Sequence, residues 1–270
     1  FVVKGKEHQS KINPEQAVVN SYGGKLIFCS GEMTFSSLDL LKKEFSQSTV
    51  GDIKLPLEYM DRHNINCENL KICINQFSTV KVCVVGDLIV DEYITCEALG
   101  MSQEDPTIVV TPIDTTKFIG GSAIVAAHAA GLGANVEYIS IVGNDAGKFF
   151  AKEELVEASV KVELIVDGGR PTTVKQRFRS KGKTLLRVSH LHQVGISPEL
   201  QKHFLEKIKS NIDKIDLIVF SDFNYGCLPQ ELVDEIIKLG KSNQVMMVAD
   251  SQSSSQIGDI SRFHAMDLIT

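Results

Sequence analysis

Two adjacent glycines, Gly120 and Gly121, stand directly before "SAIVAAHAAG" at 122–131, a helix-like run of small residues. Glycine lets the backbone come close to a ligand, and the first amides of a helix favour anionic or hydroxyl-rich groups. We expect Ser122 to cap this helix, and Gly131 to help end it. The pattern therefore indicates either a ligand-binding loop or a simple turn from a strand into a helix.

Two aspartates come just after a run that is typical of a buried strand. Asp87 and Asp91 follow "VKVCVVG" at 80–86, which is continuous, apolar and β-branched, as in a parallel sheet covered on both faces. Open α/β sheets bind ligands beyond the carboxyl ends of their strands. By the same argument Asp222 and Asp250, which end "DLIVFSD" and "QVMMVAD", are candidates for a cleft at that edge.

Composition and the remaining motifs exclude several classes of protein. The net charge of −6 and the lack of a Lys/Arg-rich run argue against nucleic acid and membrane surfaces as partners. No apolar run is long enough for a membrane span, and the six cysteines form no C-x-x-C pair, so we expect a cytoplasmic protein with reduced thiols. "GNDAGKF" at 143–149 fails as a phosphate-binding P-loop because Phe149 stands where Ser or Thr is required, and no G-x-G-x-x-G follows a strand.

The elements that must position these residues alternate along the chain. Helical patterns are expected at 122–131, 147–158, 198–212 and 229–241, between apolar strand-like runs. This alternation predicts an open α/β sheet with right-handed crossovers. From 160 to 189 the strands are joined by "DGGRP" and "SKGK" turns, which predict antiparallel hairpins that serve as a lid or a subunit contact.

Three segments of the chain differ in their pattern of predicted helices and strands. Residues 1–46 hold short strands and a helix expected over "SSLDLLKKEF", too little chain for an independent domain. Residues 47–79 are predicted to be a linker with one amphipathic helix in "NCENLKICINQF". Residues 80–270 carry the α/β pattern.

Read together, the motifs of 80–270 resemble the ribokinase-like, or PfkB, carbohydrate kinases, and more closely the kinase module of bifunctional heptose 7-phosphate kinase/heptose 1-phosphate nucleotidyltransferases. The matching motifs are G-D-x-x-x-D-x-Y at 86–93, the glycine pair, L-G-A at 132–134, V-G-x-D at 142–145, P-T-T-x-K-x-R at 171–177, L-L-R at 185–187 and S-D-F at 221–223. Residues 1–46 look like the tail of a Rossmann-like nucleotidyltransferase domain without its H-x-G-H signature.

The resemblance implies a ribokinase-like open, mostly parallel sheet with flanking helices and a small antiparallel lid. It implies ATP- and Mg²⁺-dependent phosphorylation of D-glycero-D-manno-heptose 7-phosphate at its anomeric hydroxyl, which supplies activated heptose (ADP-heptose) for lipopolysaccharide. Metal ligands stay unassigned. The catalytic base and the anion hole would lie in a G-A-G-D loop beyond Thr270, so we expect a truncated kinase domain that is inactive alone.

The resemblance also implies roles for individual residues. Asp91 would accept hydrogen bonds from sugar hydroxyls with Asp87 beside it, and the glycine pair would lie against the sugar. The basic residues of the hairpins would lie near the substrate phosphate or shape the lid; they are Lys175, Arg177 and Arg187. Asp222 and Asp250 would line the nucleotide side of the cleft. Lids of this type often pair between subunits, so a homodimer is expected.

Three residues depart from the heptose kinase pattern. Ile124 stands where Asn is usual, Tyr225 replaces a lysine, and Gln252 stands in place of the lysine of a D-P-K turn. These departures keep two alternatives open: a kinase of the same fold for another sugar or a nucleoside, and a non-catalytic sugar-binding domain.

Overall fold

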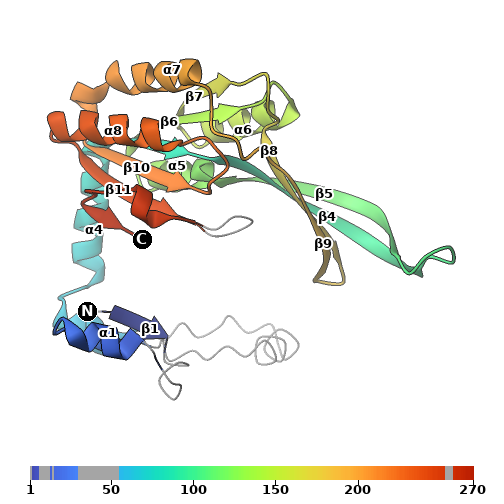
Figure 1. The fold of residues 1–270 in the computed structure, drawn as a ribbon, viewed down its shortest axis with the longest axis horizontal. Coiled ribbons are helices and arrows are strands. Elements are labelled where there is room, and N and C mark those ends of the chain that lie inside the picture. Colours follow the sequence, from blue (N-terminus) through green and yellow to red (C-terminus); the bar gives the residue numbers. More distant parts are fainter. Residues whose placement is uncertain (1, 6–12, 14, 30–54, 253–257) are drawn as a thin grey trace. The chain divides into compact units, whose positions relative to one another are not determined.

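The computed structural model describes residues 2–5, 13, 15–29, 55–252 and 258–270 (Figure 1). The chain forms two compact units, Phe1–Met60 and Asp61–Thr270, and their division falls within the segment 47–79 that was expected to be a linker. No helix among the described residues is long and apolar enough to cross a membrane.

Among its described residues, the first unit holds a parallel strand pair. Strand β1 (Val2–Gly5) pairs with β2 (Leu26–Cys29), and helix α1 (Glu15–Ser21) lies between them in the chain. Both strands were predicted. The helix expected over "SSLDLLKKEF" lies outside the described residues. Helix α3 (Leu57–Arg62) spans the division between the units.

The second unit begins with α4 (Cys67–Gln76), which was predicted within "NCENLKICINQF". The side chain of Asn66 caps it by accepting from the Asn69 N–H, at 2.8 Å. A short 3₁₀ helix, η2 (Phe77–Thr79), leads from α4 into the first strand of the main sheet.

A parallel sheet of six strands forms the centre of the second unit, in the order β12-β11-β10-β3-β6-β7. All of its ladders are parallel. The strands are β3 (Lys81–Gly86), β6 (Asn135–Val142), β7 (Lys161–Val166), β10 (Leu217–Asp222), β11 (Met246–Ser251) and β12 (Leu268–Ile269). The predicted open α/β sheet is confirmed.

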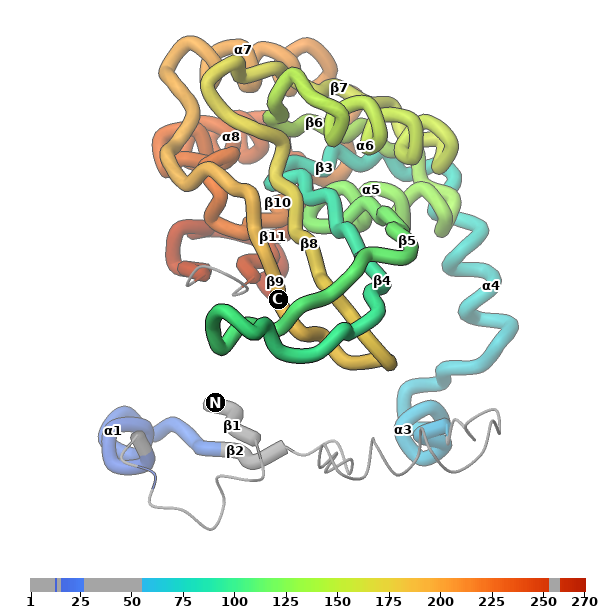
Figure 2. The backbone as a smooth tube through the Cα atoms, turned by 90° about the vertical axis from the view of Figure 1, so that its right-hand side faces the viewer, coloured from blue at the N-terminus to red at the C-terminus, as the bar shows by residue number. Residues whose placement is uncertain are grey.

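Helices cover both faces of this sheet (Figure 2). Helices α7 (Pro198–Lys209) and α8 (Gln230–Ser242) pack on one face through residues such as Phe204 and Ile236. Helices α5 (Ser122–Gly131) and α6 (Ala146–Glu157) cover the other face, where Ala126 and Leu155 are fully buried. All four helices were predicted to within about three residues. Two further 3₁₀ helices, η3 (Ile212–Lys214) and η4 (Ile260–Arg262), lie in connections.

A second sheet of four strands forms the lid, in the order β5-β4-β8-β9. It consists of β4 (Leu88–Met101), β5 (Ile108–Gly121), β8 (Thr173–Ser180) and β9 (Lys183–His190). The outer pairs are antiparallel, whereas β4 and β8 are parallel. Figures 1 and 2 show these strands extending away from the parallel sheet.

The prediction of an antiparallel hairpin is therefore right for β8 and β9, but the predicted boundaries of the lid are wrong. The segment at 160–166 was expected in an antiparallel hairpin, but β7 is the parallel edge strand of the main sheet. Strand β4 was not predicted at all. Its first residues continue the apolar run of β3, and only Asp87 separates the two strands. Gly86, the last residue of β3, has φ of +154° where the chain turns from one sheet into the other.

Candidate active site

Asp87 follows β3 directly, and its carboxylate binds the chain itself. It accepts hydrogen bonds from the N–H groups of Phe223 (2.8 Å), Tyr225 (3.3 Å) and Cys227 (3.1 Å). Burial and, to a lesser extent, the charge of the Asp222 carboxylate raise the pKa of Asp87 to about 6, although the three N–H groups oppose this rise. Asp87 thus fixes the loop 223–227 at the carboxyl end of the sheet.

The glycine pair permits two close approaches at the end of β5. A Cβ added to Gly120 would overlap the carboxylate of Asp91, and one added to Gly121 would overlap the carbonyl of Asp87. Gly121 also has φ of +59°, in the left-handed region that favours glycine. The pair therefore brings β5 against both predicted site aspartates.

Ser122 does not cap helix α5 as expected. The N-cap is Gly121, which has no side chain, while Ser122 is fully buried. The Ser122 N–H donates to the Asp87 carbonyl at 3.0 Å, and its hydroxyl lies 2.7 Å from that of Tyr138. The tight packing of β5 on β4 places Ser122 inside the core, where its hydroxyl needs a buried partner.

Asp91 and Arg177 form an ion pair on one face of the lid. Asp91 on β4 and Lys175 on β8 are register partners, so Arg177, two residues further along β8, shares their face. About a fifth of each paired side chain is exposed, which leaves the carboxylate accessible to a ligand. Next to Gly120, Asp91 is thus a charged acceptor that is held in place by its neighbour.

Lys175 connects this lid face to the loop that Asp87 fixes. Its side chain is buried, with 3% of its surface exposed. The ammonium lies 5.0 Å from the ring centre of Tyr225 and 5.2 Å from that of Phe223, within the range of cation–π attraction. The lid and the end of β10 therefore meet through a cation on two aromatic rings.

Further cations follow on the same face of the lid. Arg187 on β9 is the exposed register partner of Arg177. The guanidinium carbons of Arg177 and Arg179 lie 5.0 and 5.7 Å from the ring centre of Tyr93. Arg179 and Tyr93 were not predicted as site residues. Arg179 lies two residues after Arg177, and Tyr93 lies two residues after Asp91, so each shares a face of its strand with a predicted site residue. This spacing identifies them only once β4 and β8 are known to be neighbouring strands.

Asp222 ends β10 and is almost completely buried. It accepts from Arg262 and from the Ser251 hydroxyl, both at 3.3 Å, and from the Asn224 N–H at 3.2 Å. Burial raises its pKa, although the charge of Arg262 works against that rise. Asp222, like Asp87, mainly holds neighbouring segments, and Arg262 was missed because no local pattern links residues 40 positions apart.

Asp250 lies on β11 and is directed away from Asp222. The register pairs Asp250 with Ser221 and Asp222 with Ser251, so the two carboxylates are on opposite faces of the sheet. Asp250 accepts from neutral donors, Gln252 at 2.8 and 2.9 Å and Thr270 at 3.2 Å. Of the predicted residues, the structure thus brings Asp91, Gly120, Lys175, Arg177 and Arg187 to the lid, and it places Asp87, Asp222 and Asp250 at the sheet edge.

Two of the three departures from the family pattern contact these site residues. The buried ring of Tyr225 lies under Lys175, and the exposed Gln252 binds Asp250. Ile124, by contrast, packs against the core beneath α5.

Comparisons with known proteins identify relatives of the chain. The Bifunctional protein HldE of Helicobacter hepaticus is 30% identical over 191 residues, which are 70% of this chain and 39% of that protein. That of Desulfatibacillum aliphaticivorans is 29% identical over 212 residues, 78% of this chain and 42% of the relative. The chain thus spans less than half of the length of these relatives.

The fold is shared with a solved sugar kinase. Phosphofructokinase-2 from Escherichia coli, in complex with fructose-6-phosphate, matches with a TM-score of 0.54 and 14% identity, over 70% of this chain and 60% of that one. This likeness concerns the fold alone, and the predicted ribokinase-like fold is confirmed. The model of the family described as pfkB family carbohydrate kinase matches residues 79–269. The chain therefore belongs to the pfkB family of carbohydrate kinases.

Proposed function

We propose that this chain is the kinase part of a bifunctional enzyme and that it phosphorylates D-glycero-D-manno-heptose 7-phosphate at the anomeric hydroxyl. The observation that carries this proposal is the lid face, where the accessible carboxylate of Asp91 lies beside Gly120 among several cations. A carboxylate accepts hydrogen bonds from sugar hydroxyls, and cations attract the phosphate of a sugar phosphate.

The residues of this face have different roles in binding a phosphorylated sugar. Asp91 orients the sugar hydroxyls, while Arg177 holds Asp91 in one position. Arg187 and Arg179 supply positive charge further along the same face. Such positioning brings an acceptor hydroxyl into line with a phosphoryl donor, which is the main contribution of a protein to phosphoryl transfer.

ATP with Mg²⁺ is the proposed phosphoryl donor. Mg²⁺ is usually bound through one or two carboxylates together with substrate phosphates, and it neutralises charge that develops on the transferred group. Asp250 fits this requirement because its described partners, Gln252 and Thr270, are neutral and leave its negative charge uncompensated. Asp222 and Arg262 would then shape the sheet edge beside the nucleotide.

The proposal extends to the rest of the relatives' activity. Both relatives are named as bifunctional proteins, and a heptose 1-phosphate nucleotidyltransferase would convert the product of the next step into ADP-heptose for lipopolysaccharide. The parallel β1–α1–β2 unit is consistent with the tail of such a domain.

A kinase for another sugar is the second candidate. Tyr225 favours it, because this aromatic ring occupies a position where the heptose kinases carry a lysine, and it lies directly under Lys175. One cation is thereby missing from the cleft, which weakens attraction for a second phosphate on the substrate.

We also propose that the lid pairs with a second copy of the chain. The ends of β4 and β5 pair only with each other among the described strands, and they expose large apolar side chains: Leu99, Met101, Ile108 and Ile113. A two-stranded hairpin is marginally stable alone, so a second copy that covers these side chains would stabilise it.

Turnover by the full-length protein tests the kinase proposal. ATP is supplied with heptose 7-phosphate, fructose 6-phosphate, ribose and adenosine in turn, and the products are identified by mass. A heptose bisphosphate formed alone supports the heptose proposal, and turnover of another acceptor supports the second candidate. If ATP binds but nothing is phosphorylated, the domain is a non-catalytic binding module and the kinase proposal fails.

A further inference from the structure

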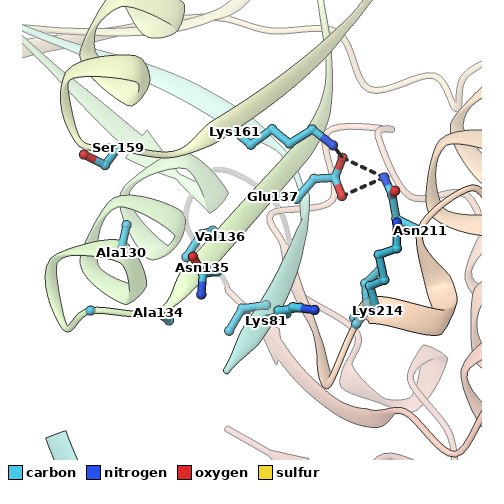
Figure 3. Close-up of a pocket in the computed structure, with 13 residues that line it drawn as sticks. Lys81, Ala130, Ala134, Asn135, Val136, Glu137, Ser159, Lys161, Asn211 and Lys214 are labelled. Atoms are coloured by element: carbon cyan, nitrogen blue, oxygen red, sulfur yellow. Dashed lines mark hydrogen bonds and ion pairs between the residues drawn. The ribbon is translucent and has the colours of Figure 1, made fainter. Parts of the chain in front are cut away.

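A pocket of about 630 Å³ opens at the amino ends of β3 and β6 (Figure 3). Lys81 and Asn135, the first residues of these two strands, contribute to its wall. Asp87 lies at the opposite end of β3, so the six residues of this strand separate the pocket from the candidate active site by about 20 Å. None of the lining residues belongs to the candidate active site.

The pocket exists because small residues meet where helix α5 ends. Ala130, Gly133 and Ala134 line it, and no larger side chain of this turn fills the space. Gly133 has φ of +104°, a conformation that L side chains rarely adopt, so a larger residue is disfavoured there. Val82 and Val136, both buried, add an apolar floor. The volume is within the range of about 300–1,000 Å³ that is typical of small-molecule sites.

The polar part of the lining is strongly basic. Three lysines, Lys81, Lys161 and Lys214, stand against a single carboxylate, that of Glu137, although the whole chain carries a net charge of −6. Glu137 lies between the Lys161 ammonium, at 2.7 Å, and the Asn211 amide, at 3.1 Å, as Figure 3 shows. It therefore neutralises Lys161.

The other two ammonium groups have a different environment. Lys81 and Lys214 are exposed, and among residues 55–252 and 258–270 their side chains make no ion pair or hydrogen bond. The main-chain N–H of Lys81 donates to the Asp216 carboxylate at 2.8 Å. Two positive charges at the mouth of a pocket with an apolar floor are complementary to a dianion that carries a small organic group.

We propose that this pocket binds a phosphomonoester, with the dianionic phosphate at Lys81 and Lys214 and the organic part against Val82, Val136 and Ala134. Asn211 and Glu137 present an amide and a carboxylate to hydroxyl groups of that organic part. The site differs from the candidate active site in place and in residues. Its existence does not depend on the proposed kinase substrate.

Calorimetric titration of the full-length protein tests this proposal, with glucose 6-phosphate as the probe and glucose and inorganic phosphate as references. We expect Lys81→Gln/Lys214→Gln to weaken binding of glucose 6-phosphate at least about tenfold, because two charge-assisted contacts are lost. Ala130→Leu, which fills the pocket and keeps its charges, is expected to weaken it as well. Thermal unfolding of each variant verifies that it is folded.

Two controls separate the pocket from the candidate active site and from net charge. Lys152→Gln/Lys202→Gln makes the same change of charge at exposed helix positions and should leave the dissociation constant within about twofold of the original value. Asp91→Asn reports any binding of glucose 6-phosphate at the candidate active site. The proposal is overturned if Asp91→Asn abolishes binding while the Lys81/Lys214 variant retains it, or if no binding is detected. Equal affinity for inorganic phosphate would overturn the assignment of an organic part.

Discussion

The carboxylate of Asp87 accepts a hydrogen bond from the N–H of Phe223 at 2.8 Å, across 136 residues of sequence. This bond links the ends of two adjacent parallel strands, β3 and β10, and it holds the ring of Phe223 near the Lys175 ammonium. One buried carboxylate thus determines where the sheet edge meets the lid.

Asp87 makes folding stability depend on pH. Its pKa is raised from 3.8 to about 6 in the folded protein, chiefly by burial, so the folded state binds this proton more tightly than the unfolded chain does. The stabilisation that this proton provides is complete below about pH 4 and is lost as the pH rises through about 6, and it amounts to roughly 3 kcal/mol.

Asp87→Asn, which does not titrate, isolates this contribution. We expect the free energy of unfolding of the original protein, minus that of the variant, to fall by roughly 3 kcal/mol from about pH 4 to about pH 7 in urea titrations. A difference that stays constant over this range would show that the pKa of Asp87 is not raised.

The ion pair of Asp91 and Arg177 is expected to serve binding more than stability. Asp91→Asn keeps the size of the side chain but removes the charged acceptor, so kcat/KM for the sugar should fall about a hundredfold. The matched control is Glu163→Gln, which breaks the partly exposed Glu163–Lys207 pair on β7 and α7 and should leave turnover unchanged. Equal effects of the two variants would exclude a role of Asp91 in substrate binding.

Lys175→Met tests the contact between lid and loop. The change keeps a long side chain but removes the charge that lies over Phe223 and Tyr225, so we expect KM for the sugar to rise about tenfold. Lys148→Met removes a comparable cation–π contact, 4.7 Å above the ring of Phe149, on helix α6. It should leave KM unchanged, and an unchanged KM in Lys175→Met as well would contradict the assigned role.

Gly120→Ala tests the approach of β5 to Asp91. The added Cβ would displace the Asp91 carboxylate, so turnover should fall by up to about 10²-fold, while the melting temperature changes little. Gly168→Ala is the control, because a Cβ there meets no atom within 4 Å. If Gly120→Ala retains full turnover, the position of Asp91 does not depend on this glycine.

The lid is expected to mediate dimer formation. Leu99→Glu with Ile113→Glu introduces charges on the exposed apolar part of β4 and β5 and should convert a dimer into monomers in light scattering. Val156→Glu, at an exposed position of helix α6, should leave the mass unchanged. A monomeric original protein would refute the pairing.

The sequence alone predicted the parallel sheet and its four covering helices because their patterns are local. "VKVCVVG" is apolar at nearly every position, as a doubly covered strand must be, and helix α8 repeats its apolar residues with the period of a helix. The sequence-based prediction missed β4, because its alternating residues directly continue the buried strand β3. The prediction also placed β7 in the wrong sheet, because a turn motif follows this strand.

For the candidate site, too, some features were predicted from the sequence and others were shown only by the tertiary structure. The types and spacing of Asp87, Asp91 and the glycine pair predicted a group of residues that the structure brings together, because carboxylates and flexible backbone at strand ends are visible in one sequence. Only the tertiary structure showed that Asp87 binds a distant loop, that Asp91 pairs with Arg177, and that Lys175 lies over Tyr225. Such partners are set by which strands become neighbours and by their register, and these depend on the packing of the whole domain rather than on any local pattern.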